Sequence, residues 1–145
     1  AAVSALAKMG AEGAEQALVY LEDEHPAVRQ AAVKVYSPLH SRLPTEIAKV
    51  HEEAVAFRLL DEDWRVRLAV VVALGDLRAT EYIEQVAALR GDDNDQVRRS
   101  AVVTLEKLDA EACHVAAFLG DEDAKCRGEA ERAYVALGGG AAGDD

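Results

Sequence analysis

Apolar residues recur along most of the chain at the three- and four-residue spacing of amphipathic helices. Four stretches repeat one pattern, in which an Arg is followed by apolar or small residues three, six, seven and ten positions later. The residues at the seventh and tenth positions are Tyr36 and Leu39, Leu74 and Leu77, Leu105 and Leu108, and Tyr134 and Leu137. Positions with this spacing share one face of a helix, so the pattern predicts four equivalent helices.

A second amphipathic stretch precedes each of these helices. These stretches cover residues 14–21, 47–60, 82–89 and 112–119. A short acidic turn follows each stretch, so every repeat is predicted to be a pair of antiparallel helices. The opening segment matches the second helix alone, and the Gly-rich end is predicted to be a flexible tail or a linker. The predicted array spans residues 1–138, with a half unit at 1–10, units at about 11–40, 41–78, 79–108 and 109–138, and a tail at 139–145.

Each acidic turn contains an Asp that precedes the Arg of the second helix by six residues. The pairs are Asp23/Arg29, Asp61/Arg67, Asp92/Arg98 and Asp121/Arg127. A spacing that recurs four times is an internal repeat. Four residues before their Arg, Asp63, Asn94 and Asp123 are predicted N-caps of the second helices. The first unit has His25 at that position and Pro26 at the first helical position.

Other helix ends are predicted from residue type. Thr80 and Asp109 are candidate N-caps for the first helices of the third and fourth units. Glycines near helix ends are expected where the backbone turns left-handed. These are Gly75, Gly91, Gly120 and Gly138. Residues 37–46 hold Pro38 and Pro44 and are predicted to be an insertion, either a functional loop or a kink in the array.

The segments DEDWRVRLAVVVALGDL and DDNDQVRRSAVVTLEKL resemble HEAT repeats at their Asp, Val-Arg, small and Leu positions. Successive Arg residues lie 38, 31 and 29 positions apart, which resembles the compact HEAT-like repeats of bilin-lyase-type and related scaffold proteins. The resemblance implies an all-α, right-handed α-solenoid of about four and a half helix pairs. It also implies that the four Asp/Arg pairs form a structural hydrogen-bonded ladder along one edge of the stack.

Composition argues against two classes of function. The chain has 145 residues, half of them apolar, which is enough for one packed domain. Its net charge is −11, which disfavours binding to nucleic acid or to an anionic membrane. No apolar run approaches the roughly 18–20 residues that cross a bilayer. We therefore predict no nucleic-acid partner and no direct membrane insertion.

No catalytic, cofactor or metal site is predicted, and the protein is expected not to be an enzyme. The acidic turn at residues 92–95 lacks the Gly and the distal Glu of a calcium loop. His51-Glu52 is a single pair, whereas HEAT-like di-iron hydroxylases have several, and His51 is expected on an exposed or half-buried helix face. Cys113 and Cys126 are predicted to be buried thiols of an intracellular, reducing compartment, with a disulfide or metal pair as the alternative.

The remaining candidate is the surface of the second helices, which usually line the concave side of HEAT-like arrays. The predicted partner-binding residues are Lys34, Trp64, Leu68, Val72, Arg99, Val103 and Arg132. Apolar residues flanked by cations predict a groove for a helix or extended segment that is apolar in the middle and acidic at its flanks. The alternative is that neighbouring helices cover these residues. Trp64 is either an interface residue or a cover over the neighbouring turn.

The predicted function is a noncatalytic protein-binding scaffold or adaptor, either a peripheral subunit of a larger assembly or a fragment of a longer array. The ends of a stable array need polar capping units. The opening helix instead carries apolar residues that need cover. These are Ala2, Val3, Ala5, Leu6 and Met9. A helper for chromophore attachment, as in bilin lyases, is the alternative, and it rests on analogy of fold alone.

Overall fold

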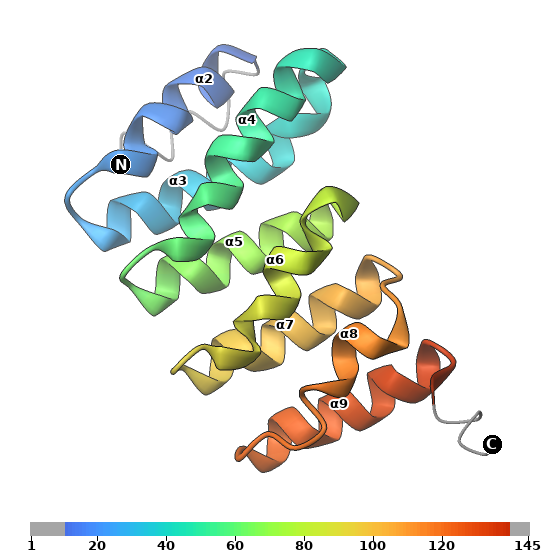
Figure 1. Cartoon of the computed structure of the whole chain (residues 1–145). Coiled ribbons are helices and arrows are strands. Elements are labelled where there is room, and N and C mark those ends of the chain that lie inside the picture. Colours follow the sequence, from blue (N-terminus) through green and yellow to red (C-terminus); the bar gives the residue numbers. More distant parts are fainter. Residues whose placement is uncertain (1–10, 140–145) are drawn as a thin grey trace. The chain divides into compact units, whose positions relative to one another are not determined.

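A computed structural model of the chain describes residues 11–139, in which the regular elements are α-helices and short 3-10 turns, with no strand. This confirms the predicted all-α class. The chain divides into two compact units, Ala1–Leu77 and Arg78–Asp145 (Figure 1). The predicted half unit at 1–10 and residues 140–145 of the predicted tail lie outside the described residues. Within residues 11–139, no helix combines the length and the apolarity that crossing a membrane requires.

Unit 1 holds two helix pairs in its described part. The elements are α2 (Ala11–Val19), α3 (Pro26–Leu39), α4 (Thr45–Phe57) and α5 (Trp64–Asp76), with 3-10 turns at Tyr20–Glu22, His40–Arg42 and Arg58–Leu60. The second helices, α3 and α5, pack against each other, and α2 packs against α3 (Figure 1). Tyr36, Val55 and Leu74 are fully buried between these helices, as the apolar periodicity predicts.

Unit 2 repeats the arrangement with shorter first helices. Its elements are α6 (Ile83–Ala87), α7 (Asp95–Lys107), α8 (Ala112–Ala116) and α9 (Ala124–Ala136), with 3-10 turns at Thr80–Tyr82 and Ala88–Gly91. Helix α7 packs against α9, α6 against α7, and α8 against α9 (Figure 1). Leu105, Val115 and Phe118 are fully buried in its core.

The predicted N-caps of the second helices are confirmed. Asp63 accepts a hydrogen bond from the Arg65 amide, Asn94 from the amides of Gln96 and Val97, and Asp123 from the Cys126 amide. Each bond satisfies an amide that has no partner inside the helix. His25 precedes α3 without a capping side-chain bond, and Pro26 occupies the first turn, as predicted.

Two other predicted caps are wrong. Thr80 opens a 3-10 turn, and the residue before α6 is Tyr82. Asp109 ends the preceding helix α7, because its φ is 55° and the Ala110 amide donates to the Leu105 carbonyl at 3.0 Å. Together with the bond from the Asp109 amide to the Glu106 carbonyl, this is a Schellman ending. Asp tolerates the left-handed region better than most residues, so Gly is not required there.

The left-handed backbone conformation predicted for four glycines is found at one of them. Gly138 has a φ of 91°, whereas Gly75, Gly91 and Gly120 do not have a positive φ. At the end of α5 the left-handed residue is Arg78, with a φ of 56°. Its Nη1 donates to the carbonyl of Lys107 at 2.8 Å, so a side-chain bond accompanies the strained backbone.

The predicted loop at residues 37–46 is mostly helical. Helix α3 continues through Pro38 to Leu39, a 3-10 turn follows, and Pro44 is the residue before α4. Pro38 lies in the last turn of α3, where its missing amide proton removes only one helical hydrogen bond. The two prolines therefore end one helix and begin the next.

Candidate functional site

The four Asp/Arg turns share one set of hydrogen bonds. In each turn the Asp carboxylate accepts from the amide two residues later, at 2.8–2.9 Å. The Arg six residues on donates through Nη1 to the backbone carbonyl of the same Asp, at 2.6–2.8 Å. The recurring spacing thus closes each turn on itself, which explains why both residue types return at a fixed distance.

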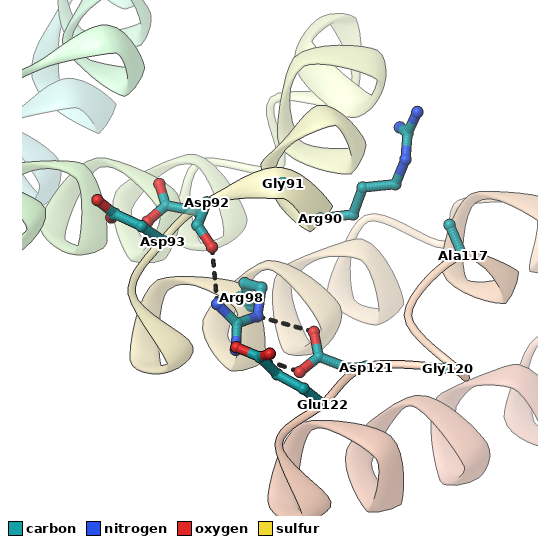
Figure 2. A pocket seen from close by; sticks show the side chains of 9 residues that line it. All are labelled: Arg90, Gly91, Asp92, Asp93, Arg98, Ala117, Gly120, Asp121 and Glu122. Atoms are coloured by element: carbon teal, nitrogen blue, oxygen red, sulfur yellow. Dashed lines mark hydrogen bonds and ion pairs between the residues drawn. The ribbon is translucent and has the colours of Figure 1, made fainter.

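Inside each unit, an Arg side chain also reaches the Asp of the following turn. Arg29 donates through Nε and Nη2 to the two carboxylate oxygens of Asp61, at 2.7 and 2.9 Å. Arg98 bonds Asp121 in the same way, at 2.7 and 3.2 Å (Figure 2). The Arg29 and Asp61 side chains are only 7% and 1% exposed, so this pair lies inside unit 1. The Asp23 side chain instead contacts the ring of His25.

Arg67 and Arg127 also close their own turns. Arg67 donates through Nη1 to the Asp61 carbonyl at 2.8 Å, which is a bond within its own turn. Arg127 likewise donates to the carbonyls of Asp121 and Glu122, at 2.6 and 3.1 Å. Both residues are half-buried, whereas Arg29 and Arg98 are buried. The bond common to all four Arg is therefore the one that closes each turn.

The position of each Arg along the chain decides whether a bond to the next turn lies within one unit. Arg127 lies in the last Asp-containing turn of residues 11–139, and its predicted place in the ladder stays a prediction. The next turn after Arg67 is that of Asp92, which belongs to unit 2, so a ladder bond from Arg67 stays a prediction. Arg29 and Arg98 each join two successive turns inside one unit.

Both bidentate pairs are ionised. Burial raises the pKa of Asp61, but the hydrogen bonds from Arg29 and from the Asp63 amide outweigh it, so this pKa lies below its usual value. Asp121 follows the same balance with Arg98 and the Asp123 amide. Bonds to these carboxylates raise the pKa of both guanidinium groups. Carboxylates held this way are poor general acids or bases near neutral pH, which favours a structural role.

A shallow pocket lies beside the second of these pairs. Arg98 and Asp121 form part of its wall, and Asp92, Asp93 and Glu122 make the rest largely acidic (Figure 2). The Arg90 side chain extends away from the Arg98–Asp121 pair (Figure 2). Because Arg98 already bonds both Asp92 and Asp121, its donors are committed to the turns and not to a ligand.

The predicted partner-binding residues of unit 1 lie on α3 and α5. Val72 is 43% exposed, Leu68 is half-buried, and Lys34 is exposed on the neighbouring helix. Trp64 is the first residue of α5 and is half-buried. Lys34 makes no ion pair with another described residue, so its charge is open to a ligand.

The predicted partner-binding residues of unit 2 lie on α7 and α9. Val103 is 39% exposed, at the position of α7 that matches Val72 on α5. The two cations beside it already face carboxylates on these helices. Arg99 lies 3.8 Å from Asp95, and Arg132 contacts Glu106 and Glu129. A ligand carboxylate would therefore compete with these exposed pairs.

His51 is buried, so its predicted exposed or half-buried position is wrong. It is 7% exposed on α4, and its ring centroid lies 5.9 Å from that of Tyr36. Burial lowers the His51 pKa; the negative charge of Glu15 opposes this, and His40 adds to it. His40 in turn lies 2.7 Å from Glu52. The signal was present, because residue 51 falls on the same helix face as the buried residues 48, 52 and 55.

One group of metal-ligating side chains was missed by the sequence analysis. Ligand atoms of Glu111, Cys113 and His114 lie within 4.8 Å of one another, the one such group within residues 11–139. His114 Nε2 also lies 2.9 Å from a carboxylate oxygen of Glu84. These ligand types suit zinc, but their spacing matches no familiar zinc motif. Cys113 is exposed, so its predicted burial is wrong, whereas the predicted burial of Cys126 is confirmed.

A family described as HEAT repeats matches residues 52–135, from the middle of α4 to near the end of α9. No curated protein matches the chain.

Proposed function

Since the chain belongs to the HEAT-repeat family, we propose that it is a noncatalytic scaffold that binds a protein partner through its second helices. HEAT repeats commonly mediate protein–protein interactions. The observation that supports this role is the exposure of Val72 and Val103, which occupy equivalent positions on α5 and α7. Apolar side chains that remain exposed at a repeated position are typical of an interaction surface.

The charges beside these valines indicate what kind of partner fits. Lys34 holds on α3 the repeat position that Val72 holds on α5, and Arg99 and Arg132 accompany Val103 in unit 2. Positive side chains on a chain of net charge −11 favour a segment with an apolar centre and acidic flanks. We propose a helix or an extended segment of another subunit as the ligand, within an intracellular, reducing compartment. Val72 in unit 1 and Val103 in unit 2 each belong to such a surface of their own unit.

Affinity capture from the native source, with quantitative mass spectrometry, tests this function. Leu68→Glu/Val72→Glu should lower recovery of the partner by about tenfold or more, because two apolar contacts with the partner would become charged. Val135→Glu is the matched control, since Val135 is an exposed valine on a second helix outside the predicted surface. Equal recovery with the double variant and the wild type, at unchanged circular dichroism, would contradict the proposal.

The compact bilin-lyase-type subtype and the chromophore-attachment role remain predictions from resemblance. The visible absorbance of protein purified from its source tests them, because a bound tetrapyrrole colours the sample.

A further inference from the structure

Helix α4 carries a row of exposed apolar side chains along its outer face. Ile47, Val50 and Phe57 are 44%, 64% and 64% exposed, and Ala54 between them is exposed as well. We call these four residues the outer stripe. Leu60, 79% exposed in the 3-10 turn that follows, extends the row. The opposite face of α4 is buried in unit 1 through Ala48, His51, Glu52, Val55 and Ala56.

The spacing of the outer stripe fits a helical ligand. Its residues are separated by three, four and three positions, which is the heptad spacing along which a second helix packs. The stripe covers about ten residues, or about 15 Å of helix. Large apolar side chains in a continuous row differ from isolated exposed residues, which are common on any surface. The row therefore indicates a docking surface on the first-helix side, separate from Val72 on α5.

The free charges beside the outer stripe are negative. Glu46 and Glu53 lie along one edge, both exposed, and neither forms an ion pair with another described residue. Lys49 lies near them but has an interaction of its own. On the other edge, Arg58 stacks on Phe57 at 5.7 Å and lies 3.6 Å from Asp61, so its charge is compensated within the chain.

A second copy of the chain fits this surface poorly. In an antiparallel pair of α4 helices like edges meet, so Glu53 of one copy would face Glu53 of the other. In a parallel pair Glu53 would face Arg58, which already pairs with Asp61. Uncompensated acidic groups beside an apolar row favour a ligand of opposite charge.

We propose that the outer stripe binds an amphipathic helix of a partner protein, one with apolar residues at heptad spacing and Lys or Arg along the edge that meets Glu46 and Glu53. This surface is additional to the one on the second helices. The ligand charge also differs, because the second helices favour an acidic segment and the outer stripe a basic one.

Two designed helical peptides test the proposal. Both carry Leu at heptad spacing, one has Lys and the other Glu along the flanking positions, and binding is followed by fluorescence anisotropy on the full chain. We expect the Lys peptide to bind at least about tenfold more tightly than the Glu peptide. Val50→Ser/Phe57→Ser should weaken the Lys peptide by about tenfold without changing any charge. Glu46→Lys/Glu53→Lys should reverse the preference between the peptides.

Three results would overturn it. These are equal binding of the two peptides, Lys-peptide binding that survives Val50→Ser/Phe57→Ser, and sedimentation that shows a dimer abolished by the same substitutions. The last result would assign the surface to a second copy. Val50 and Phe57 are exposed, so circular dichroism should show an intact fold. Val72→Glu is the control that separates the two surfaces, because it should leave Lys-peptide binding unchanged.

Discussion

The Arg29 guanidinium bonds two successive turns at once: Nε and Nη2 donate to the carboxylate of Asp61, while Nη1 donates to the backbone carbonyl of Asp23. Arg98 does the same with Asp121 and Asp92. Each of these two Arg residues therefore fixes the turn of its own repeat and sets its distance from the next. Because the bonds are charge-assisted and bidentate, they constrain direction as well as distance.

Removing one partner of the buried pair should destabilise unit 1. Arg29→Met leaves the Asp61 carboxylate buried without its counter-charge, and we expect the free energy of unfolding to fall by about 3 kcal/mol. Urea denaturation followed by circular dichroism measures it. Arg65→Met is the control, since it removes an exposed pair with Asp63 and should change stability little. Similar losses for the two variants would show that burial of the Arg29–Asp61 pair is unimportant.

Stability should decline in acid through the same carboxylates. The pKa values of Asp61 and Asp121 are lower in the folded chain than their usual 3.8, so their stabilisation is present above that pH. It is lost as the pH falls through the folded pKa values, because the unfolded chain then binds more protons. Urea midpoints between about pH 6 and pH 3 should show this fall. Asp61→Asn, though less stable throughout, should have a flatter profile below about pH 4, and an unchanged slope would exclude Asp61 as a contributor.

His51 should add a second pH dependence nearer neutrality. Its pKa is lowered from 6.5 because burial disfavours the charged ring, so the unfolded chain takes up a proton at a higher pH than the folded one. Stability is therefore full above about pH 6.5 and declines as the pH falls toward the folded pKa. His51→Gln should flatten the profile of unfolding free energy between about pH 7 and pH 5. A wild-type profile that is already flat in this range would contradict the burial argument.

The N-caps make separable contributions to the second helices. Asn94→Ala leaves the amides of Gln96 and Val97 without their acceptor and should cost about 1 kcal/mol. His25→Ser offers a cap where the chain has none and should raise stability by about 0.5 kcal/mol. Thermal and urea unfolding of both variants measure the two effects. If both substitutions destabilise, then the His25 contact with Asp23 outweighs the missing cap.

The two cysteines should react at very different rates. Cys113 is exposed, whereas Cys126 is fully buried, and burial together with the charge of Asp121 raises its pKa to about 12. A thiol-disulfide reagent should therefore modify one thiol per native chain quickly and the second only on unfolding. Cys113→Ser should remove the fast phase. Two fast-reacting thiols in the native protein would show that α9 opens readily.

The sequence predicted the helices and most second-helix caps because these depend on local rules. Apolar spacing identified α3, α5, α7 and α9, and a short polar residue before each start identified Asp63, Asn94 and Asp123.

The ladder was predicted less completely, because it depends on contacts between repeats. The bond from Arg29 to Asp61 was predicted only from the family resemblance. The spacing within one repeat does not tell which residue of the next repeat an Arg contacts. The same resemblance assigned Arg67 and Arg127 to the ladder, and for these two residues a bond to a neighbouring turn stays a prediction. The bond from each Arg to the carbonyl of its own turn underlies the fixed spacing, but the spacing alone did not name the carbonyl as the acceptor.

Other features were missed where residue type was given more weight than position. His51 was expected on an exposed or half-buried helix face, although it lies on the buried face of α4. Cys113 was treated as a core residue, although α8 has only five residues and little of it can be covered. The outer stripe was missed because residues 47–60 were predicted only as one amphipathic stretch, with no position assigned to the core or to the surface. To predict which α4 residues are buried, one would need to know which of its two apolar faces packs against the rest of unit 1.

The double bonding of Arg29 bears on how such a chain can change length. The turn that follows Arg29 contains Asp61, whose carboxylate accepts from the preceding repeat. It also contains Arg67, which occupies the same repeat position as Arg29. A repeat that is duplicated in tandem would therefore carry both the acceptor Asp and the donor Arg, at the same spacing as in the repeats on either side. Recombination could then lengthen or shorten an array without new turn chemistry, while the exposed faces of the copied helices diverge independently.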